Sequence, residues 1–204
     1  MRNLDRDLTR HLTLWLSWLL ASAAGGTAIG TWIVLTGSNE IFVFLFFTGF
    51  VIGVAQWLVL RCYFRGALWW IPASGFAWFV SLIVMSIIIG KTTNPIAEFI
   101  SSVLGRWLWR VFGINVINGT GVGAGLGVAQ WLVLRRQTQS AGWWVLASVV
   151  GGAINGAVAV SVARIDGVIG TALPYVVGWA ANGAVTGIVL VWLVSNRTDM
   201  NRAR

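Results

Sequence analysis

Six long stretches without a charged side chain limit this chain to a membrane-spanning fold. They are Leu12–Thr36, Ile41–Leu60, Gly66–Gly90, Val111–Leu134, Thr138–Ala163 and Gly167–Asn196. Each can cross a hydrocarbon core of about 30 Å as a helix that rises about 1.5 Å per residue. Only 10% of the residues are charged, against about 25% in a soluble domain. The sequence therefore predicts an all-α integral membrane bundle of six helices, forming a single transmembrane domain over residues 1–204.

The basic residues predict how this bundle is oriented. In a six-span topology one side carries ten arginines: Arg2, Arg6, Arg10, Arg61, Arg65, Arg135, Arg136, Arg197, Arg202 and Arg204. The other side carries Lys91, Arg106, Arg110 and Arg164. This bias predicts that both termini are cytoplasmic, with the bacterial inner membrane as the expected location. We expect the basic residues that give the net charge of +8 to interact with anionic lipid headgroups of the bilayer. No nucleic-acid partner is expected.

An internal repeat organises the chain. The nonapeptide GVAQWLVLR occurs at Gly53–Arg61 and again at Gly127–Arg135. A second segment type begins at Trp18, Trp70 and Trp144, where the sequence reads Trp-x-x-Ala-Ser. We interpret the chain as three parallel helical hairpins at about 12–60, 66–134 and 140–196, with Trp192 ending the last one. Three parallel units suggest a pseudo-threefold arrangement around the membrane normal, unlike the inverted repeats of many transporters.

Small residues spaced by four predict close helix packing. In a bilayer such residues let helix backbones approach one another. The predicted packing positions are Gly26, Gly30, Gly49, Gly53, Gly123, Gly127, Gly152, Gly156, Gly183 and Gly187. The third stretch, which begins at Gly66, lacks this small-residue stripe. We therefore expect its helix to be the one that faces lipid or a partner.

The long connection 91–119 contains a further predicted helix at about 95–112. Its apolar residues follow a helical period, and polar residues cover the opposite face. Asn94 and Pro95 suit the cap and first turn of a helix. We expect an amphipathic helix lying flat at the outer interface. Its alternative role is a lid or a docking surface.

The residues typical of enzyme active sites are scarce. There is one histidine, His11, and one cysteine, Cys62, and the six acidic residues all lie in tails or loops. No metal-binding or nucleophile motif is present, and ion-coupled transporters usually bury charged groups that this chain lacks. We therefore expect a non-enzymatic protein with no metal and no cofactor.

Neutral polar residues at membrane depth are the candidate ligand-binding groups. They are Gln56, Gln130, Asn155 and Asn182. Gln56 and Gln130 extend the small-residue stripes of their helices, so each amide can bond to a neighbouring helix, worth about 0.6–2 kcal/mol. Structural bonding between helices and the lining of a pocket for an uncharged or amphipathic ligand are the two interpretations that remain open.

Nine of the fourteen tryptophans cluster near the predicted cytoplasmic interface, where aromatic residues anchor membrane proteins. They are Trp15, Trp18, Trp57, Trp69, Trp70, Trp131, Trp143, Trp144 and Trp192. We expect interface anchoring for most of this set, with a cage for a pigment or substrate as the alternative.

The QWLVLR turns, the paired tryptophans and the glycine-rich spans resemble small, uncharacterised multipass membrane proteins of the cyanobacterial type, a likeness that implies no activity. We expect an accessory, assembly or interaction component of a membrane complex, with a membrane-protein partner or a second copy of the chain. The alternative is a membrane protein that binds a small solute or lipophilic ligand. Six spans in about 200 residues resemble the substrate-binding subunits of energy-coupling-factor vitamin transporters. A polar pocket beneath the 91–119 connection would favour this alternative.

Overall fold

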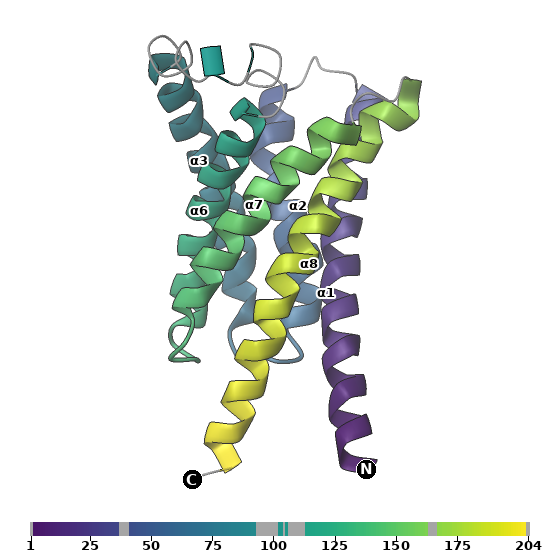
Figure 1. The fold of residues 1–204 in the computed structure, drawn as a ribbon, viewed down its shortest axis with the longest axis vertical. Helices are drawn as coiled ribbons and strands as arrows, with labels where there is room; N and C mark the ends of the chain where they lie inside the picture. The colour runs from purple at the N-terminus through teal and green to yellow at the C-terminus, as the bar shows by residue number, and fades with distance from the viewer. Residues whose placement is uncertain are drawn as a thin grey trace.

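In the computed structural model we describe residues 2–36, 41–92, 102–103, 105, 113–162 and 167–202. These residues form six long helices and one short 3₁₀ turn (Figure 1). The elements are α1 (Arg2–Thr36), α2 (Ile41–Leu60), η2 (Ala67–Trp69), α3 (Trp70–Thr92), α6 (Ile114–Leu134), α7 (Gly142–Val162) and α8 (Gly167–Arg202). The prediction of an all-α chain is confirmed for this part of the protein. Nearly all of the predicted amphipathic helix at 95–112 lies outside the described residues.

The helices have the length and composition of membrane spans. Five segments are long and apolar enough to cross a bilayer: Asp7–Thr36, Ala67–Ile89, Ile114–Leu134, Gly142–Val162 and Ile169–Asn196. Over its described side chains α2 is a shorter apolar helix, Phe46–Leu60. Leu12, Leu16 and Leu20 form an exposed stripe on α1 at steps of four, which is stable only against lipid. The chain is therefore an integral membrane protein.

The six helices form a closed ring. Each helix packs against the next one in the chain, and α8 closes the ring by packing against α1. Both termini lie at the same end of the bundle as the turns after α2 and α6 (Figure 1). We call this the termini end, and the opposite one, where α6 and α8 begin, the far end. The ring encloses a central axis that no helix occupies.

Glycines hold three pairs of helices in backbone contact. A side chain added at Gly26 of α1 would meet the backbone of Tyr175 on α8, and one added at Gly49 of α2 would meet the carbonyl oxygen of Ser74 on α3. One added at Gly123 of α6 would meet the carbonyl oxygen of Ser148 on α7. All ten predicted packing glycines lie in these pairs, α1/α8, α2/α3 and α6/α7.

These pairs differ from the hairpins expected from the sequence. The hairpins at about 12–60, 66–134 and 140–196 group α1 with α2, α3 with α6, and α7 with α8. Those neighbours also touch, but the glycine contacts lie between helices joined at the termini end. The turns within Arg61–Gly66 and Arg135–Ala141 are short, so they hold the two helices of a pair together. The α1/α8 pair forms without such a turn.

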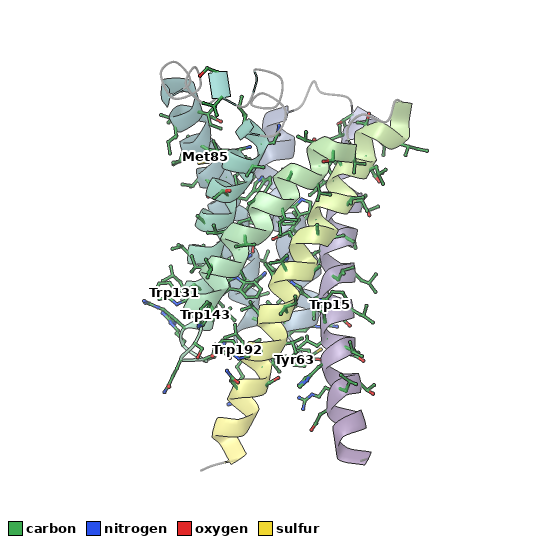
Figure 2. The ribbon with its side chains drawn as sticks, in the orientation of Figure 1. Trp15, Tyr63, Met85, Trp131, Trp143 and Trp192 are labelled. Atoms are coloured by element: carbon green, nitrogen blue, oxygen red, sulfur yellow. The ribbon has the colours of Figure 1, made fainter. Side chains whose placement is uncertain are left out.

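The apolar interior divides into two clusters. The larger one lies at the termini end and includes Leu14, Trp18, Leu60, Trp70 and Trp144. The smaller one lies towards the far end, around Ile52, Met85 and Trp179. Figure 2 shows Trp131, Trp143 and Trp192 in the half of the molecule near the termini, whereas Met85 lies in the far half. The interior is solid at one end and looser at the other.

Candidate ligand-binding cavity

Three tryptophans meet on the axis of the ring. The ring centroids of Trp18, Trp70 and Trp144 are 5.4–5.9 Å apart and the rings meet edge to face at 70–79°. All three side chains are at most 1% exposed. This edge-to-face geometry is the favourable one for aromatic pairs. Interface anchoring is therefore wrong for these three residues, because a three-way aromatic contact buries them completely. It suits their neighbours Trp69 and Trp143, which are 72% and 57% exposed.

Two glutamines bind this aromatic layer to the surrounding helices. The indole N–H of Trp70 donates to Oε1 of Gln56 at 3.0 Å, and Nε2 of Gln56 donates to Oγ of Ser22 at 3.2 Å.

The second copy of the repeat forms the same chain of bonds. Trp144 donates to Gln130 at 2.9 Å, and Gln130 donates to Ser74 at 2.9 Å. Each glutamine therefore joins three helices with one amide: α3, α2 and α1 in the first copy, and α7, α6 and α3 in the second.

The third copy replaces the glutamine with a threonine. Trp18 donates to Oγ1 of Thr186 at 2.9 Å. Gly183 lies against Ser22 as Gly53 lies against Ser74, so Thr186 occupies the place of the glutamine. Trp192, which the sequence suggested as the end of this unit, lies beyond it and is 40% exposed. Ser148 receives no glutamine amide, and its hydroxyl donates to the carbonyl oxygen of Trp144 at 2.8 Å.

A cavity of about 480 Å³ lies between this layer and the far end. Its wall reaches from Trp144, Gln56 and Gln130 to Asn115 and Gly170, which lie at the far ends of α6 and α8. Small-molecule sites in proteins have volumes of about 300–1,000 Å³. The aromatic layer closes the cavity towards the termini end, so it is a pocket with a floor.

The structure brings all four predicted binding residues to this cavity. Gln56 and Gln130 line its floor, and Asn155 and Asn182 line its wall. The side-chain oxygen of Asn155 lies against Gly178 on α8, and that of Asn182 lies against Gly151 on α7. No side-chain amide of Asn155 or Asn182 forms a hydrogen bond with another described residue. These two amides can therefore bond to a ligand, whereas the amides of Gln56 and Gln130 already bond to tryptophan and serine side chains.

Sequence reasoning missed several lining residues, among them Asn118 and Trp78. Asn118 lies three steps of four before Gln130, on the same face of α6 as Val122 and Leu126, which also line the cavity. Extending the glutamine stripe would have found it.

Trp78 carries an unpartnered donor. Its side chain lines the cavity beside Trp179, with ring centroids 5.5 Å apart. Its indole nitrogen is buried and has no hydrogen-bond partner among the described residues. An unpaired buried donor costs about 1–3 kcal/mol, so the packing around Trp78 leaves one polar group unsatisfied.

A proline adds an acceptor to the cavity wall. Pro174 lies inside α8, and it lacks the N–H that would donate to the carbonyl of Gly170. Both residues line the cavity. Together with the asparagine amides, this wall offers hydrogen-bond donors and acceptors.

The lining contains no aspartate, glutamate, lysine, arginine or histidine among the described residues. In the same part of the chain no cluster of three metal-ligating side chains occurs. His11 lies far from the cavity, where its Nε2 is 3.0 Å from Oγ of Ser195 across the α1/α8 pair. The cavity can therefore recognise shape and neutral hydrogen-bonding groups.

Comparison of the chain with protein families, curated proteins and solved structures found no match.

Proposed function

We propose that this protein binds a small, uncharged solute with hydrogen-bonding groups in its central cavity, as the membrane subunit of an uptake system would. The observation that carries the proposal is a cavity at membrane depth that is lined by uncharged side chains and closed at one end by the aromatic layer. The side-chain amides of Asn155 and Asn182 line this cavity, and they form no hydrogen bond with another described residue, so an occupant can pair with them. A bundle built only for interaction would gain stability by filling this space.

The size and chemistry of the cavity indicate the class of ligand. A charged ligand finds no counter-ion in the described lining, and desolvating a charge without one is costly. A purely apolar ligand would leave the amides unpaired. The best fit is a neutral molecule with a ring or chain that stacks beside Trp78 and Trp179, and polar groups that pair with the asparagines.

The same proposal includes six spans arranged as three related units. Trp18, Trp70 and Trp144, which align in sequence, also occupy equivalent places around the axis. In each unit the tryptophan donates to the preceding helix of the ring, at Thr186, Gln56 or Gln130. The turns after α2 and α6 can lie on the same side of the membrane only if α2 crosses the membrane completely.

We further propose that both termini are cytoplasmic and that the membrane is the bacterial inner membrane. Arg61, Arg65, Arg135 and Arg136 all lie in turns at the termini end. Short loops rich in arginine stay on the cytoplasmic side. The cavity would then be filled from the outer side of the membrane.

The test compares two phenylalanine substitutions on α7. Ala159 lines the cavity, whereas Ala157 lies outside its lining, on the side of α7 that carries the exposed Ile154 and Ser161. Small molecules released by solvent from the detergent-purified protein are identified by mass spectrometry. We expect one solute in near-equal molar amount in wild type and Ala157→Phe, and little of it in Ala159→Phe, because the new ring fills the cavity.

The accessory role expected from the sequence gives the opposite result. In that case native mass spectrometry of the gently extracted protein finds a polypeptide partner, and no solute distinguishes Ala159→Phe from Ala157→Phe. A wild-type protein that carries no solute from any preparation would also contradict the proposal.

A further inference from the structure

A groove separates α3 from α6 on the outer surface of the bundle, away from the central cavity. Its volume is about 1660 Å³. Its walls are mainly apolar, formed by Pro72, Ala73, Phe76, Ala77, Val80, Ala124, Val128, Ala129, Leu132 and Val133. Phe76, Val80, Val128 and Leu132 are exposed, so the groove opens towards the lipid. We call it the α3–α6 groove.

The groove exists because α3 meets α6 through side chains. A side chain added at Gly121 or Gly125 of α6 would meet the side chains of Met85 and Ser81 on α3. The α3/α6 pair has no glycine-to-backbone contact of the kind found between α6 and α7. The two helices therefore stand further apart, and the gap remains open down to the termini end.

Three arginines surround the termini end of the groove. Arg65 comes from the turn after α2, and Arg135 and Arg136 come from the turn after α6. Nε2 of Gln137 donates to the carbonyl oxygen of Arg65 at 2.6 Å, which ties the two turns together. The guanidinium of Arg135 lies 5.0 Å from the ring centroid of Trp131.

No carboxylate balances these charges in the described part of the chain. Asp7 on α1 is the one acidic residue whose side chain is described, and it does not line the groove. All three arginines are exposed. Three cations at the end of an apolar groove match an occupant that is anionic at one end and apolar at the other.

We propose that the α3–α6 groove is a specific site for an anionic phospholipid of the phosphatidylglycerol type. The headgroup phosphate pairs with the guanidinium groups of Arg65, Arg135 and Arg136, whose planar donors match phosphate oxygens. One acyl chain runs along the groove between Phe76 and Leu132. This site is independent of the solute cavity, because the two share no lining residue.

The internal repeat supplies matched controls for both ends of the lipid. Arg61 is the repeat equivalent of Arg135 and lies 5.4 Å from the ring centroid of Trp57, but it does not line the groove. Ala55 is likewise the equivalent of Ala129, which does line it. Each substitution in the groove can therefore be compared with the same substitution in the same local sequence elsewhere.

The experiment is native mass spectrometry of the full chain in detergent, with equal amounts of phosphatidylglycerol and phosphatidylcholine bearing identical acyl chains. We expect wild type to retain phosphatidylglycerol selectively. Each neutralised arginine near the membrane surface should lower this preference about fivefold. Arg135→Gln should show that loss and Arg61→Gln should not, and the triple variant R65Q/R135Q/R136Q should lose the preference. Ala129→Trp should release both lipids, whereas Ala55→Trp should retain them.

Four results would overturn the proposal. Equal losses in Arg61→Gln and Arg135→Gln would indicate a diffuse charge effect. Equal retention of both lipids by wild type would show that the site does not recognise the headgroup. Displacement of the lipid by millimolar inorganic phosphate would indicate a free-anion site. Retention of phosphatidylglycerol by a folded Ala129→Trp variant would place the acyl chain elsewhere. If Ala129→Trp does not fold, the arginine pair alone decides.

Discussion

Helix α6 meets its two neighbours in opposite ways. Towards α7 it presents Gly119, Gly123 and Gly127, and the backbone and small residues of α7 fill the space beside them. Towards α3 it presents Gly121 and Gly125, where the side chains of Met85 and Ser81 fill that space. The first side is closed over the length of the pair, and the second leaves the α3–α6 groove.

This difference shows that a glycine stripe alone does not bring helices together. Close approach requires that the backbone or a small residue of the partner lies opposite the glycine, as at Gly152 opposite Gly119. Where the partner has a long side chain opposite the glycine, that side chain occupies the space and keeps the two helices apart. Helix α6 thus takes part in a tightly packed interface with α7 and a more loosely packed interface with α3.

The largest effect is expected for Gly123→Ala. The new methyl group would meet the carbonyl oxygen of Ser148 and the backbone of Gly152, and neither can move without separating α6 from α7. We expect the free energy of unfolding to fall by about 3 kcal/mol, at the upper end for overpacking. Unfolding by SDS in mixed micelles, followed by circular dichroism, measures it. A loss of unfolding free energy no greater than that of Gly142→Ala, where nothing lies within 4 Å, would contradict tight packing between α6 and α7.

An intermediate effect is expected for Gln130→Leu, because Gln130 bonds to both neighbours of α6. The substitution leaves the indole N–H of Trp144 and the hydroxyl of Ser74 without their partner. We expect a loss of about 2 kcal/mol. Gln56→Leu should cost a similar amount through Trp70 and Ser22. In a double-mutant cycle, Gln130→Leu and Trp144→Phe together should cost less than the sum of the two.

The smallest effect is expected for Gly121→Ala, only two residues from Gly123. Here the new methyl group meets the end of the Met85 side chain, which is long and unbranched and can therefore adopt another rotamer. The higher helix propensity of alanine, about 1 kcal/mol in water, offsets part of the contact. We expect a change in unfolding free energy of less than about 1 kcal/mol. A loss as large as that of Gly123→Ala would mean that both sides of α6 are equally rigid.

The membrane character and the helical content could be predicted because they depend on local composition. Charge-free stretches of sufficient length leave helices as the only way to satisfy the backbone in lipid. The pairing of helices could not be predicted in the same way. The closest pairs are α1/α8, α2/α3 and α6/α7, whereas chain order alone suggested pairs such as α1/α2.

The candidate site was foreseen in part. Gln56 and Gln130 fall on the packing stripes of their helices, so their approach to one interior followed from helical spacing. Asn155 and Asn182 were chosen as neutral amides at membrane depth. The role of Trp70 did not, because Trp69 and Trp70 are equivalent in composition and only the ring contact with Trp18 and Trp144 separates them. The third helix was expected to face lipid or a partner. It does so through Phe76 and Val80, but it also buries Trp70 and Ser74.

The α1/α8 pair has a consequence for synthesis. Helices α2 and α3 can pair as soon as both have entered the membrane, and so can α6 and α7. Helix α1 must wait until the last helix arrives before Gly26 and Gly30 meet Tyr175 and Ala172. Of the six helices, α1 is thus the first to be synthesised and among the last to find its glycine-packed partner. Insertion of α8 is the step that closes the ring.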